Sequence, residues 1–318
     1  MKRVVDLFAG GGGMSLGFTR AGFNVVCAVE KWQAAIDVYR ANFPDHPVLN
    51  LDLSNVDDSI RVIQEFNPEM IIGGPPCQDF SSAGKRDEKQ GRASLTVNFA
   101  EIVSYCRPQF FVMENVARAE KSQAFKDSLK IFKAAGYGLT MRVIDAAYCG
   151  VPQSRKRFIV IGALGENDDF LSEEIDQGLS QHAMSVRDYF GDDLSLEHYY
   201  RHPRSYARRG IFSVDEPSPT IRGVNRPVPK GYPGHSGDPV GLSSEIRSLN
   251  TLERAQIQTF PSHFKFPGNK TDTEQVIGNA VPVKLAEFVA EKLAKFINGA
   301  PTLMCQHALF QIPEVYEP

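Results

Sequence analysis

The first eighteen residues constrain the fold of this 318-residue chain more than any other stretch. Val4–Phe8 has the length and apolar composition of a buried strand, Gly10–Gly13 supply a tight turn, and a helical pattern follows through Phe18. A strand that enters a helix through a glycine turn is the first part of a βαβ unit. This stretch therefore predicts an α/β fold.

The same alternation of short apolar runs and amphipathic stretches continues through the first half of the chain. A helix is expected at Trp32–Phe43, and further strands at Val25–Val29, Met70–Ile72, Phe110–Met113 and Phe158–Ile161. Repeated βαβ units form a mostly parallel sheet, in which ligands bind beyond the carboxyl ends of the strands. Polar groups follow four of these runs: the glycines, Glu30, Gly73–Cys77 and Glu114.

A second, loop-rich lobe is expected after residue 165. Between His198 and His235 stand seven Lys or Arg residues against two acids, a local excess of five positive charges in a chain whose net charge is -3. Such a segment is either a solvated surface or a face for a polyanion. Regular structure is expected again from Arg247, with a helix at Val283–Ile297 that packs on the first domain. The expected units are 1–165, 166–246, 247–298 and a tail, 299–318.

Cysteine usage and hydropathy indicate a cytoplasmic protein without a membrane partner. The five cysteines are odd in number and form no CxxC pair, which suggests neither a disulfide framework nor a metal site. No apolar stretch approaches the roughly 20 residues of a membrane span, and the N-terminus does not have the pattern of a signal peptide.

The glycine turn and Glu30 together suggest a cofactor site. Glycines let a ligand approach the backbone, and a helix N-terminus offers N–H groups to it. An acid about 20 residues past the glycines can accept hydrogen bonds from ribose hydroxyls, although Glu30 could also end its strand in solvent. The turn alone fits a nucleotide, a dinucleotide or S-adenosylmethionine.

The segment GGPPCQDFSSAGK, which follows the Met70–Ile72 run, carries the sharpest chemical signal. Its glycines and prolines make a rigid loop, and a cysteine in such a loop beside a cleft is a candidate thiolate nucleophile. The alternative for Cys77 is a small buried packing residue. Glu114 ends a very apolar strand, where a carboxyl group is costly unless it is functional. Arg155 and Arg157 are two apart before a strand, so both point to one side.

In this order, the motifs resemble those of the DNA (cytosine-5) methyltransferases of the bacterial and phage single-chain type. Five blocks carry the resemblance, which covers residues 4 to about 297: DLFAGGGG, GGPPCQDFS, ENV, QSRKRFIVIG and QVIGNAVP. The resemblance implies a Rossmann-like S-adenosylmethionine-dependent methyltransferase domain with a mostly parallel sheet, plus a smaller loop-rich target-recognition domain over 166–246. It further implies methylation of carbon 5 of a cytosine within a short duplex DNA sequence.

The resemblance also assigns roles to residues. Cys77 is the implied nucleophile, Glu114 contacts the cytosine ring, and of Arg155 and Arg157 one holds the cytosine carbonyl while the other braces the active-site loop. The implied S-adenosylmethionine contacts are Phe8, Gly10, Gly12, Glu30, Asp52, Pro75, Leu95 and Asn279. The implied DNA contacts are Gln78, Ser81, Arg92, Arg208, Arg209, Thr220, Arg222 and Arg226.

Three other functions compete with this hypothesis. A nicotinamide-dependent oxidoreductase explains the glycine turn but gives Cys77 and Glu114 no task. The Cys-Phe-Thr signature of the family's tRNA-methylating branch is absent from this sequence, and the long recognition stretch favours DNA. The intact Cys77, Glu114 and arginine pair argue against a non-catalytic DNA-binding relative. The expected protein is a monomer that binds double-stranded DNA. It is either the modification enzyme of a restriction–modification system, beside a restriction endonuclease without stable contact, or an orphan methylase.

Overall fold

The computed structural model describes residues 2–76, 94–243 and 245–299. Its core is a seven-stranded sheet of order β3-β2-β1-β4-β5-β8-β6. The sheet strands are β1 (Arg3–Leu7), β2 (Asn24–Glu30), β3 (Val48–Asn50), β4 (Met70–Gly73), β5 (Phe110–Val116), β6 (Tyr137–Asp145) and β8 (Lys156–Leu164). Strands β1 to β5 run parallel to one another, and β8 is antiparallel to both of its neighbours, β5 and β6. The expected α/β fold and mostly parallel sheet are confirmed.

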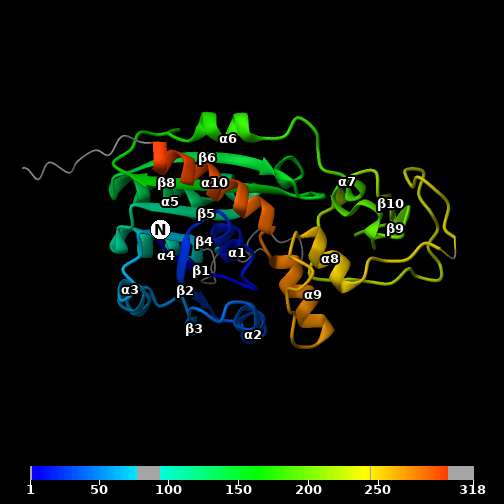
Figure 1. The fold of residues 1–318 in the computed structure, drawn as a ribbon, viewed down its shortest axis with the longest axis horizontal. Coiled ribbons are helices and arrows are strands. Elements are labelled where there is room, and N and C mark those ends of the chain that lie inside the picture. Colours follow the sequence, from blue (N-terminus) through cyan, green and yellow to red (C-terminus); the bar gives the residue numbers. More distant parts are fainter. Residues whose placement is uncertain (1, 77–93, 244, 300–318) are drawn as a thin grey trace, which may run out of the picture.

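Helices cover both faces of this sheet, as βαβ connections require (Figure 1). On one face, α1 (Gly13–Arg20) and α10 (Val283–Gly299) bury Phe18, Leu285 and Leu293 against the strands. On the other face lie α3 (Val56–Gln64), α4 (Ser94–Cys106) and α5 (Gln123–Ala134), with Phe99 and Phe132 in their core. The remaining helix of the first half, α2 (Gln33–Asn42), packs beside β3.

The expected helix at Val283–Ile297 is present and packs on the first domain, but its polar face pairs differently. The spacing of Glu291 and Lys295, four residues apart in the sequence, predicts an ion pair between them on this face. Instead, the Lys295 ammonium lies 2.9 Å from the carboxylate of Glu174. This acid belongs to α6 (Ser172–Gly178), whose Ile175 shares a core with α10. Residues 170–178 therefore pack with the large domain.

The smaller lobe is short-stranded and rich in loops, and Figure 1 shows it extending away from the sheet. Its regular elements are α7 (Val186–Phe190), β9 (His198–Tyr200), β10 (Ile211–Ser213) and β11 (Ser218–Pro219). Between it and the sheet lie α8 (Thr251–Ile257) and α9 (Lys270–Asn279). Tyr199 and Phe212 of the lobe share one apolar core with Phe260 and Val276, so the two parts of the molecule are packed together.

Short elements complete the described chain: β7 (Gln153–Ser154) and the 3-10 helices Ala117–Lys121, Ala146–Cys149 and Gly191–Asp193. No helix in the described ranges combines the length and apolarity needed to cross a bilayer.

Candidate active site

A cavity of about 700 Å³ lies at the carboxyl ends of β1, β2, β4 and β5. This is the edge of a parallel sheet where ligands bind, and the volume suits a small-molecule cofactor. Its walls include eight residues assigned from the sequence: Phe8, Gly10, Glu30, Pro75, Glu114, Arg155, Arg157 and Asn279. Segments far apart in the chain are thus brought to one site.

The glycine turn after β1 takes a shape that few side chains allow. Phe8, Gly10 and Gly12 all have positive φ, of 57°, 54° and 89°. A Cβ on Gly12 would lie 2.3 Å from the Phe43 ring, so this glycine is needed for the packing of α2 and does not line the cavity. Gly10 does line the cavity, and a Cβ there would meet no atom within 4 Å.

Glu30 fixes the turn from the end of β2. Its carboxylate accepts hydrogen bonds from the backbone N–H groups of Gly10 at 2.8 Å, Lys31 at 2.8 Å and Trp32 at 2.9 Å. The side chain is half-buried at the cavity wall. A carboxylate held in this way is oriented in advance and keeps acceptor capacity for a ligand hydroxyl.

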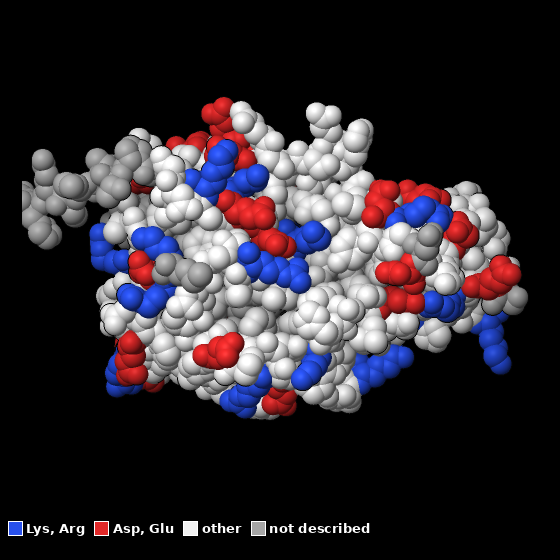
Figure 2. Space-filling model, viewed as in Figure 1, with Lys and Arg blue, Asp and Glu red and all other residues white. Residues whose placement is uncertain are grey.

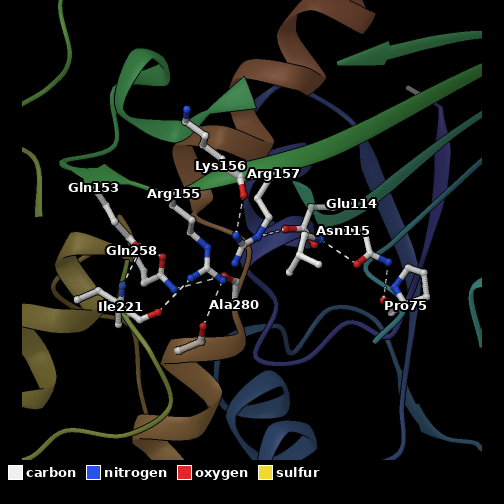
Figure 3. Close-up of polar contacts among 12 residues, drawn as sticks. Pro75, Glu114, Asn115, Gln153, Arg155, Lys156, Arg157, Ile221, Gln258 and Ala280 are labelled. Carbon is white, nitrogen blue, oxygen red and sulfur yellow. Dashed lines mark hydrogen bonds and ion pairs between the residues drawn. The ribbon is translucent and has the colours of Figure 1, made fainter. Parts of the chain in front are cut away.

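The opposite end of the cavity holds an ion pair. Glu114 of β5 is buried, and its Oε1 lies 2.6 Å from Nε of Arg157 on β8, its antiparallel neighbour (Figure 3). A Cβ on Gly74 would lie 3.2 Å from the other carboxylate oxygen, so glycine keeps the approach to Glu114 open. Next to it, Asn115 donates to the Pro75 carbonyl at 3.1 Å and thereby ties β5 to the loop after β4.

Arg155 has a different environment from Arg157, although both line the cavity. Its guanidinium is buried and donates to the carbonyls of Ile221, Gly278 and Ala280 at 3.1, 3.2 and 3.0 Å (Figure 3). Burial lowers its pKa. Arg155 therefore connects the start of β8 with the small lobe and with the end of α9, whereas Arg157 faces Glu114.

Two buried glutamines extend this connection between the lobes. Gln153 of β7 donates to the Gln258 side chain at 2.9 Å and accepts from Ile221 N–H at 2.8 Å. Gln258 in turn donates to the Ile277 carbonyl at 2.6 Å. Both side chains are fully buried, where unpaired amides are costly. The glutamine pair therefore holds three segments in one arrangement.

Residues 218–223 of the small lobe, here called the anchor strip, lie along the large domain. Ser218 and Pro219 pair in parallel with Gln153 and Ser154, and the Thr220 hydroxyl donates to the Ser154 carbonyl at 2.8 Å. A Cβ on Gly278 would lie 2.1 Å from the Gly223 nitrogen, so α9 and the strip are in close backbone contact.

Several residues assigned from the sequence lie away from the cavity or outside the described residues. Gly12, Asp52 and Leu95 do not line it. The Asp52 carboxylate pairs with Lys31, and that hydrogen bond lowers the pKa of Asp52 to about 2. Cys77, Gln78, Ser81 and Arg92 lie outside the described residues.

The arginines expected to contact DNA differ in their environments. Arg209 makes bonds of 2.9 and 2.5 Å to the Glu216 carboxylate and lies 4.3 Å from the Phe212 ring centre. The half-buried Arg222 donates to the His202 carbonyl at 2.5 Å, while Arg208 and Arg226 are exposed. On the face shown in Figure 2, positive and negative side chains are intermingled rather than gathered in one basic patch.

The structure adds cavity residues that the sequence did not single out, chiefly Asp6 and Trp32. Asp6 is fully buried in β1, and its Oδ1 has no hydrogen-bond partner among the described residues. An acid within an apolar strand was the available signal, because such a group needs a reason to be buried. Trp32 was taken as the first residue of an expected helix and not as a site residue. The helix begins one residue later, at Gln33.

The fold and the cavity define a class: a Rossmann-like α/β domain with a ligand cavity at the carboxyl ends of its strands and a smaller, loop-rich domain. Two solved structures show the same fold. A putative DNA modification methyltransferase from an E. coli prophage aligns over 94% of this chain and 100% of its own, with a TM-score of 0.68 and 24% identity. The S. pombe Dnmt2 methyltransferase aligns over 93% and 99%, with a TM-score of 0.69 and 18% identity.

The chain belongs to the C-5 cytosine-specific DNA methylase family, whose model matches residues 2–295. It is 56% identical to the Type II methyltransferase M.HindV of Haemophilus influenzae over 92% of this chain and 97% of the relative. It is 53% identical to M.HgiDI of Herpetosiphon aurantiacus over 93% and 95%. The resemblance seen in the sequence is thereby confirmed, and the protein is a DNA (cytosine-5-)-methyltransferase.

Proposed function

We propose that the chain methylates carbon 5 of a cytosine within one short duplex DNA sequence, with Cys77 as nucleophile and S-adenosylmethionine as cofactor. The single observation that carries this proposal is the cavity, which joins the Glu30 turn at one end to the Glu114–Arg157 pair at the other. A cofactor pocket is thus continuous with a site suited to a polar heteroaromatic ring.

The cavity residues fit S-adenosylmethionine in shape and polarity. Glu30 offers an oriented carboxylate to ribose hydroxyls, Phe8 and Trp32 offer aromatic surface, and Gly10 leaves open space. Pro75 and Asn279 form the wall toward Glu114 and toward α9. When bound, S-adenosylmethionine supplies an electrophilic methyl group on a sulfonium centre. Asp52 and Leu95 remain proposed adenine contacts, which a ligand would have to reach beyond the present cavity wall.

The proposed chemistry divides among three groups. The thiolate of Cys77 attacks carbon 6 of the cytosine, which makes carbon 5 nucleophilic. Negative charge develops on the ring during attack, and Glu114 delivers a proton to N3 while Arg157 turns to the ring carbonyl. Because N3 of cytosine is an acceptor, Glu114 must be protonated for this step, so the Glu114–Arg157 pair must separate when the base enters. Once carbon 5 carries the methyl group, a base removes the hydrogen from carbon 5, the bond between Cys77 and carbon 6 breaks, and the proton on N3 returns to Glu114. Arg155 braces the site from the side of the small lobe.

The target base must leave the duplex, since carbon 6 is covered by stacking. We propose that the small lobe and the segment containing Gln78, Ser81 and Arg92 hold the DNA. Arg208, Arg222 and Arg226 are proposed contacts to phosphates or base edges. Thr220, whose hydroxyl donates to the Ser154 carbonyl, is likewise a proposed DNA contact. Arg209 would have to leave Glu216 before it could contact DNA. The chain is proposed to act as a monomer in the cytoplasm, as the modification enzyme of a restriction–modification system or as an orphan methylase.

The test is transfer of a labelled methyl group from S-adenosylmethionine to duplex DNA, with the product mapped by bisulfite sequencing. We expect labelling at one short motif, and none with Cys77→Ser. Cys106→Ser, which replaces a half-buried cysteine of α4, is the matched control and should remain active. Labelling of tRNA but not DNA, or full activity of Cys77→Ser, would contradict the proposal.

A further inference from the structure

The buried Asp6 carboxyl is the first member of a chain of hydrogen bonds that leaves the cavity. The Ser15 hydroxyl of α1 donates to Asp6 Oδ2 at 2.6 Å and lies 2.7 Å from the Tyr39 hydroxyl of α2. That hydroxyl lies 2.8 Å from Nε2 of His46, in the loop before β3. Asp6, Ser15 and Tyr39 are buried, whereas His46 is half-buried. The chain therefore connects the cavity wall with the protein surface.

Internal hydrogen bonding explains only part of this arrangement. It satisfies Oδ2 of Asp6 and both hydroxyls, but it leaves Oδ1 buried at the cavity wall without a partner among the described residues. Buried polar atoms in native proteins are nearly always paired, so an unpaired carboxylate oxygen needs an explanation. A charge or a proton supplied at this point would provide one.

Among the described residues, the groups around Asp6 offer no positive charge to balance an ionised carboxyl. Glu30 at the end of β2 is another acid, and the neighbouring Cys27 is a buried thiol. Ser15 and Tyr39 are neutral hydroxyls, and the register partner on β4 is Ile72. Across the cavity, the Arg157 guanidinium is already paired with Glu114. Burial accordingly raises the pKa of Asp6 to about 7, although its hydrogen bonds with Ser15 oppose the shift.

We propose that Asp6 is a positioning residue that balances the positive charge of a sulfonium ligand, and that Ser15, Tyr39 and His46 carry its proton to the surface when that ligand enters. This inference rests on the proposed function, because it takes S-adenosylmethionine as the ligand. The Oδ1 atom is closed to direct contact, so Asp6 acts through charge across the cavity wall.

The proton balance of this step is simple. In the protonated state, Asp6 Oδ2 donates to Ser15, Ser15 donates to Tyr39, and Tyr39 donates to Nε2 of His46. One proton then shifts along each of these hydrogen bonds, and the imidazolium releases its Nδ1 proton to water. The ionised carboxylate that results accepts from the Ser15 hydroxyl, which is the direction of the Ser15–Asp6 bond described above. The carboxylate left behind balances the sulfonium. Transfer of the methyl group leaves a neutral thioether product, so the carboxyl regains its proton by the same route. Asp6 thereby favours the cationic substrate over the neutral product.

Calorimetric binding at pH 6 tests the charge-balance part. S-Adenosylmethionine and S-adenosylhomocysteine are compared in two buffers of different ionisation heat, and the slope gives the protons released. With the wild type we expect release of about one proton on binding of the sulfonium and almost none with the product. Asp6→Asn should abolish the release and weaken sulfonium binding roughly tenfold, while product affinity changes less than threefold. Product binding also shows that the variant cavity is folded.

The outcomes separate this inference from the proposed function. If neither ligand binds the wild type, the proposed cofactor is wrong. If both bind, but proton release and the ratio of the two affinities are the same in Asp6→Asn as in the wild type, the role of Asp6 is wrong and the proposed function stands.

The relay has its own test, because it affects rates rather than equilibria. Stopped-flow mixing with a pH indicator should show slower proton release in Tyr39→Phe, with the amount unchanged. Tyr137→Phe is the matched control, since this buried hydroxyl donates only to the Pro108 carbonyl, at 2.6 Å, in the core on the other face of the sheet. Equal rates in Tyr39→Phe and wild type would overturn the relay.

Discussion

At the scale of single residues, Glu114 must serve two partners in turn. It is paired with Arg157, and it must give a proton to the cytosine ring in the proposed reaction. Glu114→Gln keeps a hydrogen-bond donor of the same size but has no proton to transfer. We therefore expect single-turnover methyl transfer to slow about 10²- to 10³-fold, with the affinity for S-adenosylhomocysteine nearly unchanged.

The control for this change is Glu174→Gln, which removes the surface ion pair with Lys295 on α10. Surface pairs contribute little, so its rate should equal that of the wild type. A Glu114→Gln rate within threefold of the wild type would show that proton delivery by Glu114 is not needed.

At the scale of elements, the contact between β7 and β11 depends on the Gln153–Gln258 pair. Gln153→Met is close in volume, but it leaves the Ile221 N–H and the Gln258 oxygen without their partners. Each unsatisfied buried group costs about 1–3 kcal/mol, so the two together should lower the free energy of unfolding, measured by urea denaturation, by about 2–6 kcal/mol. Gln153→Met with Gln258→Met should be less destabilised than the sum of the single variants. Additive losses would show that the two amides act independently.

The sequence predicted the elements better than the contacts between them. Strand β1, the glycine turn and Glu114 were found because apolar periodicity and glycine act locally. The separate tasks of Arg155 and Arg157 were not assigned, because their partners Ile221 and Glu114 lie far away in the chain. Asp6 was missed because the sequence does not show whether an acid within an apolar strand is buried or has a partner.

At the scale of the whole molecule, the Asp6 carboxyl should make stability depend on pH. Its pKa rises from 3.8 to about 7 on folding. Its contribution to stability is therefore full below about pH 4 and is lost as the pH rises through about 7. For a pKa rise of about three units, the free energy of unfolding should fall by roughly 4 kcal/mol over this pH range. Asp6→Asn should remove this slope in urea denaturation of the ligand-free protein between pH 4 and 8.

Other carboxyls also titrate over this range, so the informative quantity is the difference between variant and wild type. Asp127→Asn, an exposed position on α5, should leave the wild-type slope nearly intact. Parallel pH profiles for wild type and Asp6→Asn would mean that this carboxyl is ionised in both the folded and the unfolded protein.

The anchor strip bears on how such an enzyme could acquire a new specificity. Residues 218–223 follow the small lobe's two-stranded sheet in the chain, yet their backbone is bonded to Gln153, Ser154 and Arg155. If a segment that contains the whole anchor strip were exchanged between relatives, residues of the other protein would pack against α9. Exchanges confined to residues 186–217 or 224–246 would leave the contacts of the anchor strip with the large domain and α9 unchanged. Natural recombination and laboratory grafting should therefore both be tolerated best when the junctions lie at the ends of these two ranges.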